Sequence, residues 1–65
     1  MERKYANKLR ELRGNRSRAT VAKAVGVSVS SIAMYERGER TPKDDTKIKL
    51  AKYYGKTITS IFFAP

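Results

Sequence analysis

The stretch VAKAVGVSVSSI, residues 21–32, places one glycine between two short apolar segments. Before the glycine, valine and alanine recur at helical spacing, which predicts a helix over residues 18–25. Gly26 suits the left-handed backbone that ends a helix, and Ser28 is a residue type that caps the start of the next one. Ser17 can cap the first of the two helices in the same way.

The segment after the glycine also alternates in the manner of a β-strand. Valine alternates with glycine and serine over residues 25–30, a period of two residues. The alternation stops at Ser31, and a lone strand would have no partner elsewhere in the chain. We therefore expect a helix over residues 29–37, ended by Gly38. Two short helices joined by a turn with one glycine predict a helix-turn-helix over about residues 17–37.

Turn residues divide the rest of the chain into three further helices. Apolar residues at helical spacing predict them over residues 3–13, 44–54 and 58–63. Asp44 and Asp45 complement the dipole at the start of the fourth helix. We expect an all-α fold, a compact bundle of five short helices. The apolar residues that carry the helical spacing are Tyr5, Leu9, Leu12, Val21, Ala22, Val25, Ile32, Ile48, Leu50, Ala51, Tyr54, Ile58, Ile61 and Phe62.

The size and composition of the chain limit what it can be. Its 65 residues fit one domain, residues 1–65, near the lower limit for folding alone. It has no cysteine and no histidine, which excludes disulfides and the usual zinc sites, so we expect neither a metal nor a cofactor. The sequence also has no paired-carboxylate site and no phosphate-binding glycine loop, and we do not expect an enzyme.

The chain is strongly basic. Its formal net charge is +9, and residues 1–23 hold eight basic residues against two acidic ones. Such a charge favours a polyanionic partner, nucleic acid first and an anionic membrane second. The uncharged run of residues 24–35 is well short of the roughly 20 residues that span a bilayer, and nothing resembles a signal peptide. We therefore expect a cytoplasmic protein with no membrane partner.

The segments VAKAVGVS, YERGERTP and LAKYYGKTITSIFF resemble the phage-repressor/Cro (Xre-type) helix-turn-helix domains, and the likeness covers about residues 5–63. The resemblance implies a lambda-repressor-like fold of five helices. It also implies sequence-specific binding to double-stranded operator DNA, usually as a homodimer, and regulation of transcription. We therefore predict a phage- or prophage-type repressor that binds a palindromic operator. Family members commonly carry glutamine where Arg18 stands, so the chain departs from the pattern there.

A helical wheel separates two sides of the second helix of the motif. With Ile32 at the centre of the inward side, Tyr35 and Glu36 fall within about 60° of it. The other side is small and nearly uncharged, as a helix that enters the major groove requires, although a low-charge surface or a dimer contact would look similar. We hypothesise a preference for A·T-rich half-sites, read by apolar contacts and DNA shape. The predicted base-contacting residues are Val29, Ser30, Ala33 and Met34.

Cationic and hydroxyl side chains flank this helix in the sequence. Arg18 stands in the first turn of the preceding helix, where a DNA phosphate would meet both its guanidinium and backbone N–H groups. For each of the flanking side chains the alternative is a solvated surface without a partner. The predicted phosphate-contacting residues are Arg16, Ser17, Arg18, Ser28, Arg37, Arg40, Thr41 and Lys43.

Glu36 lies on the inward side of its helix, where an unpaired carboxylate would cost several kcal/mol. We expect an arginine of the first helix to pair with it. Counted from Leu9 and Leu12, Arg13 fits best, and Arg10 is the alternative. The role of this pair would be structural, with any effect on DNA indirect.

The end of the chain holds more apolar area than a short last helix can bury, which favours an interface. We assign Ile61 and Phe63 to the interface of a homodimer, whose recognition helices would lie about 34 Å apart on DNA. Two other functions stay open: an antitoxin or regulator that acts mainly through protein–protein interaction, and a basic RNA-binding module. No small-molecule ligand is evident.

Overall fold

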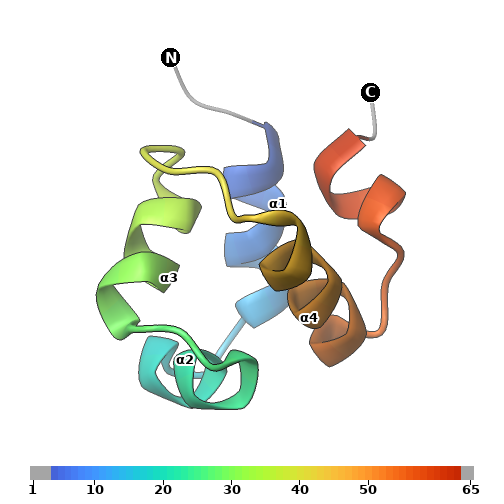
Figure 1. Ribbon diagram of the computed structural model, residues 1–65. Coiled ribbons are helices and arrows are strands. Elements are labelled where there is room, and N and C mark those ends of the chain that lie inside the picture. Colours follow the sequence, from blue (N-terminus) through green and yellow to red (C-terminus); the bar gives the residue numbers. More distant parts are fainter. Residues whose placement is uncertain (1–3, 64–65) are drawn as a thin grey trace.

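The computed structural model describes residues 4–63, and all regular elements over these residues are helices (Figure 1). They are α1 (Lys4–Arg13), α2 (Arg18–Val25), α3 (Val29–Glu36), α4 (Asp44–Tyr54) and the π-helix η1 (Thr59–Phe63). The predicted all-α fold of five helices is confirmed. Residue 3, which the sequence places in the first helix, lies outside the described residues. Within this part of the chain no helix is both long and apolar enough to cross a membrane.

The turn between α2 and α3 forms as the sequence predicts. The hydroxyl oxygens of Ser17 and Ser28 each accept a hydrogen bond of 3.0 Å from the backbone N–H three residues further on. Gly26 has a φ of +82°, which a residue with a side chain would adopt only under strain. The strand alternative for this segment is wrong, because the glycine ends one helix and Ser28 begins the next.

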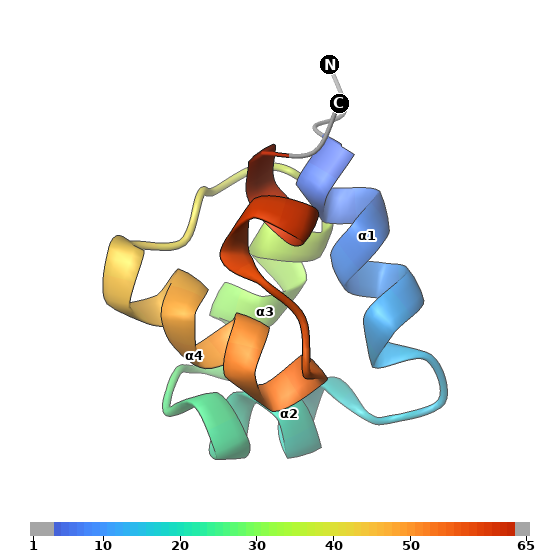
Figure 2. The same ribbon diagram turned by 90° about the vertical axis from the view of Figure 1, so that its right-hand side faces the viewer.

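The five helices enclose one hydrophobic core. α1 packs against α3 and η1, and α2 packs against α3 and α4 (Figure 1). Figure 2 shows η1 between α1 and α4, on the side of the bundle away from α3. One side of α3 is therefore buried while its opposite side faces away from the bundle. The core side chains come from all five helices: Tyr5, Ala6, Leu9, Val21, Ala22, Val25, Ile32, Tyr35, Leu50, Ala51 and Ile61.

Two isoleucines depart from a role that was assigned to them from the sequence. Ile48 helped to predict α4 but is 46% exposed, because it lies about 200° around the helix from the buried Leu50. Thr46 takes the inward position one turn before Leu50. Ile61, assigned to the dimer interface, is 3% exposed and belongs to the core, because η1 packs on α1. Its assignment to an interface is therefore wrong.

Candidate nucleic-acid interface

The two sides of α3 differ as the helical wheel predicts. Ile32, Tyr35 and Glu36 are buried, with 2%, 6% and 1% of their surface exposed. α3 forms one edge of the bundle, so its other side is free of the neighbouring helices (Figure 1). That side carries the four predicted base-contacting residues, of which the first two are exposed and the last two half-buried: Val29, Ser30, Ala33 and Met34. We call these four residues the outer face of α3.

The buried carboxylate of Glu36 is shared by two arginines from two other helices. Arg13, at the end of α1, donates from Nε to Oε2 at 2.7 Å. Arg18, at the start of α2, donates from Nε to Oε1 at 3.1 Å. Arg10 donates to the backbone carbonyl of Glu36 and to Asn7 Oδ1. One carboxylate thus joins the ends of α1, α2 and α3.

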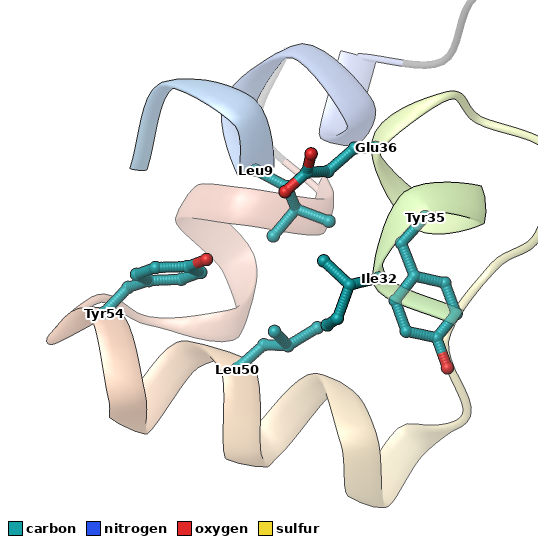
Figure 3. Close-up of a pocket in the computed structure, with 6 residues that line it drawn as sticks. All are labelled: Leu9, Ile32, Tyr35, Glu36, Leu50 and Tyr54. Carbon is teal, nitrogen blue, oxygen red and sulfur yellow. The ribbon is translucent and has the colours of Figure 1, made fainter. Parts of the chain in front are cut away.

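The charge of Glu36 also acts on the pKa values of its neighbours. The hydrogen bond to the carboxylate raises the pKa of Arg13 above the ordinary arginine value. Tyr54 of α4 is half-buried, and burial together with the charge of Glu36 raises the pKa of its hydroxyl to about 12. Figure 3 shows Glu36 and Tyr54 lining the same small space beside Leu9 and Ile32. The carboxylate therefore influences α4 as well as the helices of its partners.

Three predicted phosphate contacts lie at the starts of α2 and α3. Ser17 and Ser28 use their hydroxyls as helix caps and remain exposed. Arg18 has its Nε on Glu36 and keeps 41% of its side chain exposed. The pairing of Arg18 with Glu36 was not predicted from the sequence. The only sequence signal for it was indirect. A buried carboxylate has two oxygens, and a single arginine that donates from Nε occupies only one of them, so a second donor is needed.

Arg16 is turned toward the C-terminal end of α4. Its guanidinium carbon lies 5.5 and 5.7 Å from the ring centroids of Tyr53 and Tyr54. Its Nη1 also donates to the Leu12 carbonyl at 2.9 Å. Nothing local in the sequence indicates this contact, because both tyrosines belong to the opposite half of the chain. Of the predicted phosphate contacts, Arg16 is therefore the one held over aromatic rings.

Three further predicted contacts follow α3. Arg37 Nε lies 2.5 Å from Glu39 Oε2, and both side chains are more than half exposed. The Tyr5 hydroxyl donates to the Arg40 carbonyl at 2.9 Å and lies 3.2 Å from the Thr41 hydroxyl. These bonds attach the loop after α3 to α1, so the loop has a defined position beside the helix.

A groove of about 420 Å³ lies between the turn of the helix-turn-helix and the start of α4. Three of the predicted phosphate contacts line it: Arg40, Thr41 and Lys43. The other lining residues were not predicted to form a site, and they come together only in the folded chain: Val27, Tyr35, Asp45 and Thr46. The groove thus brings cationic and hydroxyl groups of the loop next to the inward side of α3.

The other residue of the predicted dimer interface lies on η1. Phe63 is 64% exposed. Lys47 of α4 covers part of this region, because its Nζ lies 5.6 and 5.2 Å from the ring centroids of Phe62 and Phe63. This aromatic surface is on the side of the bundle away from α3 (Figure 2).

Comparisons with known proteins agree with this geometry. A family model described as helix-turn-helix matches residues 7–61. Over 59 residues the chain is 37% identical to the cryptic phage CTXphi transcriptional repressor RstR of Vibrio cholerae, covering 88% of this chain and 53% of the relative. The chain therefore spans about half the length of that curated relative. The fold is similar to the crystal structure of the restriction-modification controller protein C.AhdI from Aeromonas hydrophila. That match has a TM-score of 0.81 and 31% identity, and it covers 91% of this chain and 92% of the other.

Proposed function

This chain belongs to the helix-turn-helix family, and we propose that it binds double-stranded DNA at a specific sequence and regulates transcription. The observation that carries the proposal is the outer face of α3, which is uncharged in a chain with a net charge of +9. The similarity to a phage repressor and to a restriction-modification controller protein supports a regulatory role. We propose repression, of the phage or prophage type, as the specific activity.

In this proposal α3 enters the major groove with its outer face against the base edges. Val29 and Ala33 offer methyl groups to thymine, Ser30 offers a hydroxyl, and Met34 packs on neighbouring bases. The face has no arginine, glutamine or asparagine for bidentate contacts with guanine or adenine. The half-sites are therefore A·T-rich and are read by apolar contacts and by the shape of the duplex.

Phosphate contacts hold the helix in the groove. The proposed set comprises the starts of α2 and α3, the residue after α3 and the groove next to α4. With about four phosphates neutralised per half-site, the plot of log K against log[salt] has a slope near −3.5. The residues proposed for these contacts are Arg16, Ser17, Arg18, Ser28, Arg37, Arg40, Thr41 and Lys43.

We further propose that the protein acts as a homodimer on a palindromic operator, with Phe63 at the interface. A two-fold dimer presents its two recognition helices about 34 Å apart, one turn of the duplex. The exposed ring of Phe63 supports this assignment, because exposed aromatic surface on a small protein favours association. In the same proposal the chain is one cytoplasmic domain that is not an enzyme and needs no cofactor.

Selection of bound duplexes from a random pool tests the proposal. We expect a palindrome with A·T-rich half-sites whose centres are about 10 base pairs apart. A pool that shows no enrichment contradicts sequence-specific binding, and fixed G·C pairs under α3 contradict the apolar readout. Single-stranded RNA is added as competitor, and RNA that displaces the duplex favours an RNA-binding module.

A matched pair of variants tests the orientation of α3. Val29 and Ile48 are similar in size and are 47% and 46% exposed, but only Val29 lies on the outer face of α3. We expect Val29→Ala to weaken binding to the selected operator several-fold while Ile48→Ala leaves it unchanged. Equal losses in the two variants would show that α3 is not the reading helix. Both proteins are compared by anisotropy titration at one salt concentration.

A further inference from the structure

We propose that Glu36 is a positioning residue for DNA binding, because its buried carboxylate orients the guanidinium of Arg18 toward a DNA phosphate. This inference rests on the proposed function and concerns the same surface. It differs from a purely structural role of Glu36, in which the pair with Arg13 only attaches α1 to α3.

Each carboxylate oxygen of Glu36 accepts a hydrogen bond from a different arginine. Oε2 accepts from Arg13 at 2.7 Å, and Oε1 accepts from Arg18 at 3.1 Å. The Glu36 side chain is 2% exposed, whereas the side chains of Arg13 and Arg18 are 20% and 41% exposed. The carboxylate is therefore fixed inside the protein, and Arg18 is the more exposed of its two arginine partners.

Arg18 contacts the carboxylate through Nε. Over residues 4–63, its two terminal nitrogens donate no hydrogen bond to the protein. A guanidinium has five N–H donors in one plane, so a bond at Nε fixes the plane and leaves the terminal N–H groups available. Those groups are the ones that bind a phosphate bidentately. The contact with Glu36 thus holds Arg18 in an orientation suited to a phosphate.

The charges of the cluster do not cancel. One carboxylate faces two guanidinium groups, so the cluster of Glu36, Arg13 and Arg18 keeps a formal charge of +1. Arg18 is the first residue of α2, where a cation opposes the helix dipole and the nearby carboxylate offsets the repulsion.

A double-mutant cycle in DNA affinity tests the inference. The probe is a fluorescein-labelled duplex of mixed sequence, since phosphate contacts do not depend on base sequence. The cycle contains the parent, Glu36→Gln, Arg18→Gln and the double variant, each checked for folding by circular dichroism at low temperature. Glutamine keeps the shape of glutamate at position 36, and at position 18 it removes the positive charge while keeping a polar side chain.

We expect Arg18→Gln to reduce the magnitude of the salt slope by about 0.9 per chain bound, the value for one phosphate contact. Glu36→Gln should weaken binding by about two- to tenfold in the parent and have no further effect in the Arg18→Gln background. Arg13→Gln is the control that removes the other partner of Glu36, and it should lower stability while leaving the salt slope unchanged.

Three results would overturn the inference. Equal losses from Glu36→Gln in both backgrounds would mean that Glu36 acts through the fold, and tighter binding by Glu36→Gln would mean that it withholds Arg18 from DNA. If Glu36→Gln does not fold, Arg18→Lys decides, because lysine keeps the charge but cannot bridge a carboxylate and a phosphate with one planar group. Arg18→Lys should bind more weakly than the parent, and equal affinity would contradict positioning.

The parent protein separates this inference from the proposed function. If the parent binds neither this duplex nor any duplex from the random pool, the proposed function is wrong. If the parent binds it and Glu36 and Arg18 show no coupling, the proposed function stands and only the positioning role is wrong.

Discussion

Glu36 and Glu39 stand three residues apart and each pairs with arginine, but the first pair is buried and the second is exposed. The Glu36 side chain is 2% exposed, and that of Glu39 is 55% exposed. The Arg37–Glu39 distance of 2.5 Å is no longer than the Arg13–Glu36 distance of 2.7 Å. The distances therefore do not indicate which pair contributes more to the stability of the fold.

Burial does indicate this, because it decides whether water can replace a partner that is lost. An exposed pair contributes about 0–1 kcal/mol, since water replaces either partner. A buried carboxylate that loses its partner, or an arginine beside the core that loses its carboxylate, has no such replacement. We infer that Glu36 maintains the arrangement of the helices, whereas the exposed Glu39 can change its partner without affecting the fold.

The largest effect should come from Glu36→Ala. It removes the carboxylate that accepts from the Nε of Arg13 at the edge of the core, and it should lower the free energy of unfolding by about 3 kcal/mol. Urea unfolding followed by circular dichroism measures the change. An unchanged midpoint with an unchanged slope would show that the buried pair contributes nothing to the fold.

The matched substitution in the exposed pair should have a much smaller effect. We expect Glu39→Ala to change the free energy of unfolding by no more than about 0.5 kcal/mol. It also frees Arg37 for phosphate, so binding to duplex DNA should be unchanged or slightly tighter. A loss of stability similar to that of Glu36→Ala would remove the distinction between the two carboxylates.

The smallest effect on stability at neutral pH should come from replacing Tyr54, whose hydroxyl pKa is raised in part by the charge of Glu36. Its pKa of about 12 lies above the ordinary value of about 10, mainly because of burial and secondarily because of the charge of Glu36. The unfolded chain therefore loses this proton first, and the contribution of Tyr54 to stability is complete below pH about 10 and is lost as the pH rises toward 12.

Absorbance of tyrosinate against pH and the thermal midpoint against pH measure this effect. Tyr54→Phe should remove the tyrosine titration step near pH 12. It should also reduce the decline in stability between pH 10 and about 12. Glu36→Gln should move the Tyr54 pKa part of the way back toward 10, whereas Glu39→Gln should not. If the Tyr54 pKa is the same in Glu36→Gln as in the parent, the charge of Glu36 does not influence α4.

Local signals in the sequence were sufficient for the helices and for the sides of α3. Caps, glycine turns and helical spacing involve residues within four or five positions of each other, and the physics that places them is contained in that short stretch. Ser17, Gly26 and Ser28 all perform the predicted backbone roles. The inward placement of Ile32, Tyr35 and Glu36 is likewise confirmed.

The contacts between distant elements were decided only by the tertiary structure. Arg18 joins Glu36, Arg16 covers two tyrosines of α4, and Ile48 is exposed. Arginine side chains are long and can reach several partners, and an isoleucine at the edge of a short helix turns inward or outward according to how the helix is rotated on its neighbours. That rotation depends on the packing of the whole core, and no single segment contains it.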